Sequence, residues 1–100
     1  MEARTAVIVL AALAQESRLA IFHLLVQAGS EGLPAGEVSK RTGIPPSSLS
    51  FHLKELTHAG LTEARQEGRF VYYRVQPDTM HTLVSYLTDH CGGAPPSTTA

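Results

Sequence analysis

The sequence predicts a mainly α-helical fold that carries one small β-hairpin, an α+β arrangement within a single domain. Three observations predict it. Apolar residues recur at helical spacing in several segments. A stretch after Gly60 alternates polar with apolar or aromatic side chains around a Glu-Gly pair. One hundred residues suffice for one domain with a limited core. We expect residues 1–91 to form that domain and the Pro/Ser/Thr-rich residues 92–100 to be a disordered tail.

Two apolar segments open the chain. Residues 4–14 are rich in Ala and Val and apolar almost all round, which predicts a helix that is buried on more than one side and needs a partner surface. Residues 16–26 form a strongly apolar amphipathic pattern that ends at Gly29, where a glycine favours helix termination. This second helix is the expected spine of the core.

Two further helices are predicted in the middle of the chain, joined by a tight turn. A short helix over residues 35–42 is closed by Gly43. The next begins near Pro46, because proline at a first helical position loses no needed N–H, and it ends at Gly60. One face of this helix is apolar, formed by Leu49, Leu53 and Leu56 with Phe51 and Ala59 nearby. Two helices joined in this way are the helix-turn-helix signature.

The other faces of the second of these helices carry short polar side chains. They are Ser47, Ser48, Ser50, His52 and Lys54. Serine and histidine are mediocre helix formers, whereas short hydroxyls suit close approach to phosphates and base edges. Two interpretations stay open for each group. The serines read DNA or only cap and solvate the helix. His52 contacts phosphate or fills a niche between the two motif helices and bonds a backbone carbonyl.

A hairpin follows directly. Residues 61–66 and 69–75 alternate in polarity around the Glu67-Gly68 pair, which predicts two strands and a glycine turn. Arg65, Arg69 and Arg74 fall on or beside it, as on the wing that a winged helix-turn-helix protein lays along DNA. Of the two tyrosines in the second strand, we expect one to pack on the core and the other, which we assign as Tyr73, to contact the DNA backbone.

The last predicted helix, the fifth, starts at Pro77. Its apolar stripe comprises Met80, Leu83, Val84 and Leu87, with Tyr86 at the side. With the first helix it gives two apolar terminal helices in a chain too small to bury them alone. Together they predict a dimer interface.

The net charge of −1 is unevenly distributed. Residues 40–74 hold six of the eight basic residues against three acidic ones, a net +3, while the remainder nets −4. Lys40 and Arg41 lie in the basic part. We therefore expect the basic side of the protein to face double-stranded DNA.

Several other classes of protein are disfavoured. No apolar run approaches the ~18 residues needed to span a membrane, and Glu2 argues against a signal peptide. A single cysteine fits a reducing cytosol, so a cytoplasmic location is expected. No nucleophile and base pair is visible, so we expect no enzyme. A winged-helix module for protein contact remains the alternative to a DNA-binding regulator.

Three blocks of residues resemble the signature of the ArsR/SmtB family of bacterial winged-helix repressors. They are residues 13–22, residues 50–61 with Ser-Phe-His-Leu-Lys-Glu-Leu and Ala-Gly-Leu, and residues 68–75 with Gly-Arg-Phe-Val-Tyr-Tyr-Arg-Val. The resemblance covers about residues 10–91. It implies a homodimer, joined through the first and last helices, that binds an inverted-repeat operator and is released by a metal, metalloid or other small effector.

The resemblance also bears on the inducer. Residues 33–38 lack the Cys-Val-Cys-type motif of many arsenite sensors, and only His90 remains of the four ligand positions in zinc-sensing members. A third branch ends its last helix with two adjacent cysteines that bind trivalent arsenic. Here Cys91 keeps one, and Gly92 stands where the second would be. No cofactor is required; the resemblance implies As(III) or another thiophilic ion as inducer, held by Cys91 and His90, with redox or persulfide sensing, or no metal, as alternatives.

Overall fold

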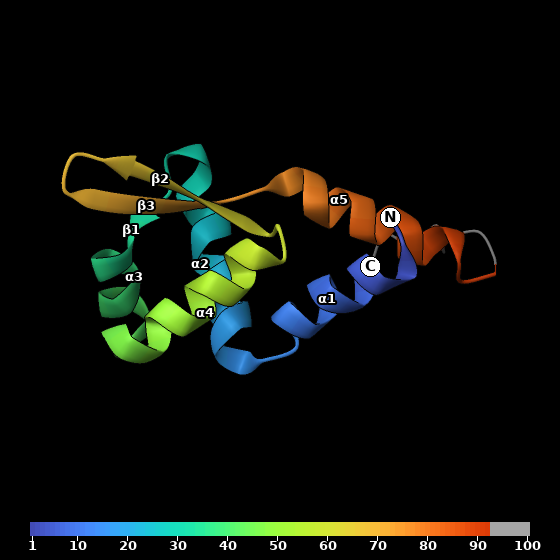
Figure 1. Ribbon diagram of the computed structural model, residues 1–100, viewed down its shortest axis with the longest axis horizontal. Helices are drawn as coiled ribbons and strands as arrows, with labels where there is room; N and C mark the ends of the chain where they lie inside the picture. Colours follow the sequence, from blue (N-terminus) through green and yellow to red (C-terminus); the bar gives the residue numbers. More distant parts are fainter. Residues whose placement is uncertain (93–100) are drawn as a thin grey trace.

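The computed structural model describes residues 1–92 and confirms a mainly α-helical fold with a β-hairpin (Figure 1). The elements are α1 (Ala3–Leu13), α2 (Glu16–Ala28), the 3₁₀ turn η1 (Gly29–Glu31), β1 (Leu33–Pro34), α3 (Ala35–Thr42), α4 (Pro46–His58), β2 (Thr62–Glu67), β3 (Phe70–Val75) and α5 (Pro77–Asp89). The expected disordered tail over 92–100 lies, apart from Gly92, outside the described residues.

The ends of α4 follow from single residues. Pro46 is its first residue, and the extended backbone of Pro45 stops any helix that comes before it. At the other end Gly60 has a φ of +80°, and the N–H of Leu61 donates to the carbonyl of Leu56 at 3.0 Å. The N–H of Gly60 donates to the carbonyl of Thr57 at 3.0 Å, which completes a Schellman motif. Both expected ends of this helix are confirmed.

The wing is larger than a two-stranded hairpin. β1 joins β2 and β3 in an antiparallel sheet of order β1-β3-β2, with Leu33 opposite Tyr73. Gly32, just before β1, has a φ of +71°, and a Cβ there would overlap the carbonyl oxygen of Tyr73. Only glycine therefore fits where the chain enters the sheet. At the tip, Gly68 (φ +62°) and Arg69 form the two-residue turn between Glu67 and Phe70.

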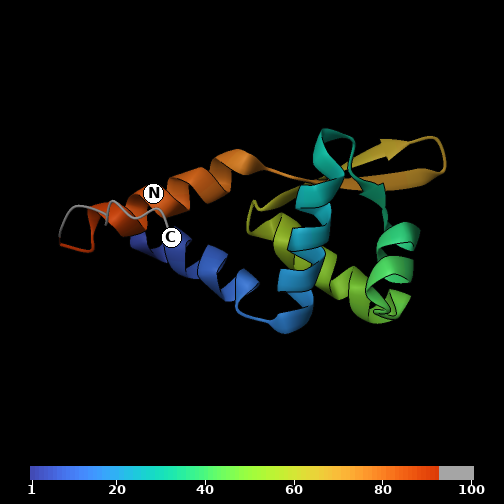
Figure 2. The same cartoon turned by 180° about the vertical axis from the view of Figure 1, so that it is seen from behind.

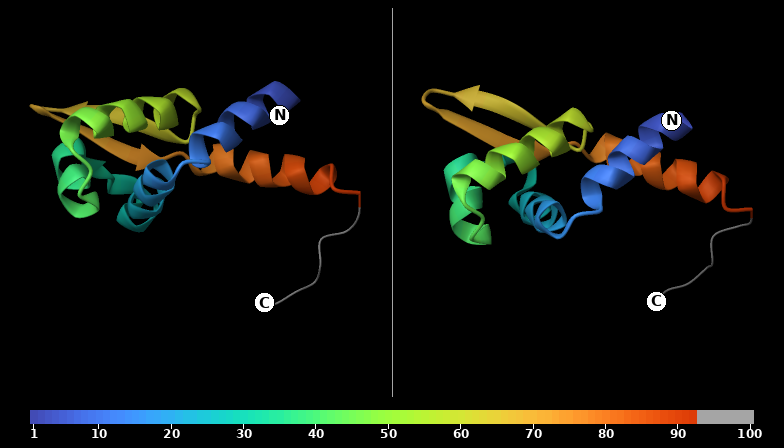
Figure 3. Two further views of the ribbon diagram at one scale, coloured as in Figure 1. Left: turned by 90° about the horizontal axis from the view of Figure 1, so that it is seen from below. Right: turned by 60° about the horizontal axis from the view of Figure 1, so that its bottom comes forward.

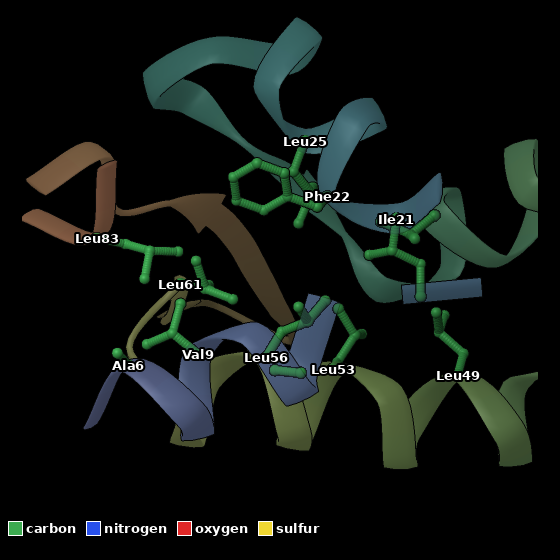
Figure 4. Close-up of a cluster of buried hydrophobic side chains, with 12 residues drawn as sticks. Ala6, Val9, Ile21, Phe22, Leu25, Leu49, Leu53, Leu56, Leu61 and Leu83 are labelled. Carbon is green, nitrogen blue, oxygen red and sulfur yellow. The ribbon is translucent and has the colours of Figure 1, made fainter. Parts of the chain in front are cut away.

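The core lies where α4 crosses α2 and α1. Figure 4 shows the leucines of α4 directed toward Ile21, Phe22 and Leu25 of α2, with a second group around Leu61. That second group comprises Ala6 and Val9 of α1, Leu61 just before β2, and Leu83 of α5. The buried face of α4 thus fixes which side of this helix remains outside.

The two ends of the molecule differ in character. It measures 48 × 30 × 23 Å, with α3, the start of α4 and the wing tip at one end and the free ends of α1 and α5 at the other (Figures 1 and 2). Figure 3 shows α1 beside α5 from two further directions. The helix-turn-helix body therefore shares its core with α1 and α5, whose free ends extend beyond it.

The expectation that α1 is buried on more than one side is wrong for the single chain. Only Ala6, Val9 and Ala12 are buried, because the core touches one side of α1. Its other side exposes large apolar residues, Val7, Ile8 and Leu10. Of the described residues, no single helix is long and apolar enough to cross a membrane; α1 and α2 with η1 pass that test of length and composition only as a pair bent by 92°.

Candidate nucleic-acid interface

The face of α4 that points away from the core carries most of the expected DNA-contacting residues. Leu49, Leu53 and Leu56 are at most 2% exposed, so they turn the opposite face of the helix to solvent. That outer face presents Ser47, Ser48, Ser50 and Lys54, all of which are exposed. Hydroxyl and ammonium groups on one accessible helix face can bond phosphates and base edges.

Phe51 does not belong to the apolar face, contrary to the sequence-based interpretation. Its side chain is 56% exposed. The helix turns by about 100° per residue, so Phe51 lies about 200° around from Leu49. The helical phase of residue 51 favours this outward position, whereas the hydrophobicity of its ring favours the core. The outer face of α4 therefore contains an aromatic ring among its polar residues.

His52 is half-buried and contacts α2 rather than pointing freely outward. Its Nδ1 lies 3.3 Å from a terminal guanidinium nitrogen of Arg18. The Nε of the same arginine donates to the carbonyl of Ala12, at the end of α1, at 2.7 Å. Arg18 thus joins three helices, α1, α2 and α4. The expected niche lay between the two motif helices, with a backbone carbonyl as the partner of His52; the observed partner is instead a side chain of α2. Phosphate contact by His52 stays a prediction.

A groove of about 390 Å³ runs between α4 and the wing. It brings together three of the expected residues, Ser50 and Lys54 from α4 and Tyr73 from β3. His58 also lines it, and sequence reasoning missed this residue. The signal was its position four residues after Lys54, which places both on one helix face. A groove with hydroxyl, ammonium, phenol and imidazole groups suits a phosphate backbone.

The register of the hairpin places two arginines beside glutamates on one face of the wing. Arg65 donates from Nε to Glu67 at 2.8 Å, and its guanidinium carbon lies 5.4 Å from the ring centroid of Tyr72. Arg74, directly opposite Glu63 in the ladder, is paired with it. These pairs neutralise much of the positive charge that the sequence attributes to the wing.

Arg69, at the wing tip, differs from the other two wing arginines. It is exposed, and within residues 1–92 no hydrogen bond or ion pair holds its side chain. Within residues 1–92, the side chains of Lys40 on α3 and Lys54 on α4 also make no hydrogen bond or ion pair. Arg41, by contrast, pairs with Glu37 at 3.0 Å. The cations available to a nucleic acid at the wing and the helix-turn-helix are therefore Lys40, Lys54 and Arg69.

The candidate inducer residues lie at the end of α5. The Nδ1 of His90 is 2.8 Å from the carbonyl of Tyr86, and their rings are 4.4 Å apart. The exposed thiol of Cys91 donates to the carbonyl of Thr88 at 3.1 Å. In the described part of one chain, no three His, Cys, Asp or Glu side chains gather as a metal site would require.

Two helices packed across a tight turn, followed by a hairpin with a cation at its tip, define a winged helix-turn-helix protein. A family model described as a helix-turn-helix domain matches residues 13–65. The uncharacterized HTH-type transcriptional regulator YceK of Bacillus subtilis is 41% identical over 73 residues, covering 73% of this chain and 72% of that protein. The transcriptional activator HlyU of Vibrio cholerae is 34% identical over 82 residues, covering 82% of this chain and 73% of that protein.

Solved structures agree with these relatives. HlyU from Vibrio cholerae has a TM-score of 0.69 at 32% identity, covering 91% of this chain and 99% of that one. The homodimeric winged helix-turn-helix DNA-binding domain of Mb0332 from Mycobacterium bovis, a possible ArsR-family regulator, has a TM-score of 0.71 at 30% identity, covering 95% and 88%. The chain belongs to the ArsR/SmtB type of helix-turn-helix transcriptional regulators. It is a DNA-binding regulator and not an enzyme.

Proposed function

We propose that this regulator binds an inverted-repeat operator as a homodimer and represses transcription by occupying it. The observation that carries the proposal is the outer face of α4, where Ser47, Ser48 and Lys54 are accessible beside the groove that ends at the wing. In a dimer, two such helices enter successive major grooves about 34 Å apart. The wings then contact the flanking backbone.

The exposed apolar side chains of α1 and α5 support the dimer. They are Val7, Ile8, Leu10, Val84 and Leu87. Helices α1 and α5 lie side by side, away from the wing tip (Figure 3), so a second copy can cover both without obstructing α4. The homodimeric state of Mb0332 is consistent with this arrangement.

DNA readout is tested by titrating the protein with the DNA upstream of its own gene and with an unrelated duplex over a range of salt concentrations. Specific binding with a steep salt dependence is expected. Ser48→Ala should narrow the affinity difference between the two duplexes, because it removes a hydroxyl near the bases and no charge. Lack of any salt-dependent preference would instead favour a module for protein contact.

The dimer is tested by Val84→Glu. Val84 is 53% exposed in the single chain, so the variant should fold while its carboxylate opposes apolar burial between copies. Sedimentation should show a monomer with weakened operator binding. Val71→Glu, on the wing, is the control and should leave the dimer intact. If the Val84→Glu variant remained a dimer, the dimer interface would not include this face of α5.

Repression is tested with a reporter gene placed behind the DNA that the protein binds specifically in the titration. Transcription should fall when the protein is present and return when α4 carries Ser48→Ala. A relative, HlyU, is named a transcriptional activator, so a rise in transcription is the informative contrary result. We propose a cytoplasmic location for the protein, because a bacterial regulator of this kind must reach the chromosome.

For the inducer, we propose a thiophilic ion such as As(III) at the end of α5. Cys91 is exposed there, next to His90, and the described residues of one chain offer too few ligands, so we propose that both chains or an external thiol contribute. Release of operator DNA should be measured with arsenite, antimonite, zinc, cadmium and persulfide. Unchanged release by all of them in Cys91→Ser would exclude this site; release by persulfide alone would indicate redox sensing.

A further inference from the structure

An aromatic ring stands in the middle of the helix face that we propose reads DNA. Phe51 is 56% exposed, while Ser47 and Ser48, one turn earlier on the same face, have short side chains. Lys54, three residues later, lies beside it on that face. Phe51 is therefore the bulkiest apolar group that this surface presents.

The ring has support on the protein side. It meets the ring of His52 edge-on, with centroids 5.8 Å apart and planes at 62°. His52 in turn contacts Arg18, whose Nε is anchored on the carbonyl of Ala12. A ring backed in this way loses less conformational freedom when it makes a contact than a freely moving one.

The chemistry of the major groove limits what such a ring can recognise. A phenyl ring neither donates nor accepts a conventional hydrogen bond, and the only apolar group on the major-groove base edges is the C5-methyl of thymine. We propose that Phe51 is a specificity-determining residue that selects a thymine in each half-site by packing against its methyl group. The proposal rests on operator binding through α4 and adds which base this helix selects.

The test uses a duplex that the full-length protein selects from a random-sequence pool, so no operator need be known beforehand. Each thymine is replaced singly by uracil, which lacks the methyl but keeps the same hydrogen-bonding edge. At one position per half-site, the loss of one buried methyl should weaken binding about fourfold, and replacement in both half-sites about 15-fold. Thymines elsewhere should show no comparable effect.

Two variants assign the effect to its residue. Phe51→Ala should bind the thymine and uracil duplexes equally, because the methyl then has no partner. Phe70→Ala on the wing is the matched control, since Phe70 is 59% exposed, and it should keep the full thymine preference. Both changes are at exposed positions, and circular dichroism checks that both variants fold.

Four outcomes would overturn the proposal. If no uracil replacement weakens the wild-type protein, or if Phe51→Ala keeps the penalty, Phe51 does not read a methyl, while operator binding itself stands. If Phe51→Ala instead loses binding to a second protein without any change on DNA, the ring is a protein contact. If the pool yields no preferred duplex, sequence-specific DNA binding fails together with the proposal.

Discussion

Replacing Glu67 with glutamine is expected to strengthen binding to DNA. In the folded chain Glu67 holds Arg65 through an ion pair at 2.8 Å, with 40% of the arginine side chain and 62% of the glutamate side chain exposed. A pair this exposed contributes about 0–1 kcal/mol, so its loss should barely change the free energy of unfolding. Arg65 stays beside Tyr72 at 5.4 Å and becomes available to a phosphate.

The size of the effect follows from counterion release. Each further phosphate contact steepens the dependence of log K on log salt concentration by ~0.9, so two freed copies of Arg65 in a dimer steepen it by about 1.8. Between 50 and 200 mM salt, the affinity advantage of Glu67→Gln over the wild type should therefore shrink by about 12-fold. Fluorescence anisotropy with a labelled duplex at four or more salt concentrations measures both slopes.

The control carries the same change of charge at the opposite end of the molecule. Asp89→Asn, at the end of α5, should leave the salt slope unchanged, because it frees no cation near the wing (Figure 1). A slope for Glu67→Gln equal to that of the wild type, or weaker binding at 50 mM, would show that Arg65 does not meet phosphate and that the wing acts through Arg69 alone.

The remaining predictions concern the wing tip, the glycines and the core. Arg69→Ala should weaken binding to all sequences and flatten the salt slope of a dimer by about 1.8, as the same titration would show. Gly32→Ala should lower the free energy of unfolding by about 2–5 kcal/mol in urea, since φ is +71° and the Cβ overlaps Tyr73. Gly68→Ala, with open space around its Cβ, should cost only about 1–2 kcal/mol. Leu56 is fully buried, so Leu56→Ala should lower the free energy of unfolding by about 2–5 kcal/mol. If Gly32→Ala and Gly68→Ala lowered the free energy of unfolding equally, the overlap with Tyr73 would not matter and the packing argument would be contradicted.

Features set by neighbouring residues could be predicted from the sequence. Pro46 and Gly60 fix the ends of α4 through their own backbone preferences. Gly68 marks the hairpin turn, but the turn comprises Gly68 and Arg69 rather than the expected Glu67-Gly68 pair, because Glu67 still pairs with Phe70 in the sheet. The periodicity of the leucines identified the buried face of α4. Such features depend on a few consecutive residues, which is why they need no knowledge of the tertiary fold.

Contacts between distant residues could not be predicted in the same way. β1 forms because Leu33 meets Tyr73, 40 positions away, and a two-residue strand has no pattern of its own. Arg18 and His52, separated by 34 positions, meet only once α2 crosses α4. The pairing of Arg65 with Glu67, two positions along the same strand, could not be predicted from residue counts, because it depends on the conformations of both side chains.

The paired arginines also affect how quickly the protein finds its target. A genome presents about 10⁶–10⁹ competing sites, and attraction to them comes almost entirely from unpaired cations. Because Arg41, Arg65 and Arg74 are each held by a glutamate, we expect the protein to dwell only briefly on random sequence. If α4 reads bases as proposed, occupancy of the operator then depends mainly on those contacts, and a modest loss of them should be enough to release the protein to other DNA.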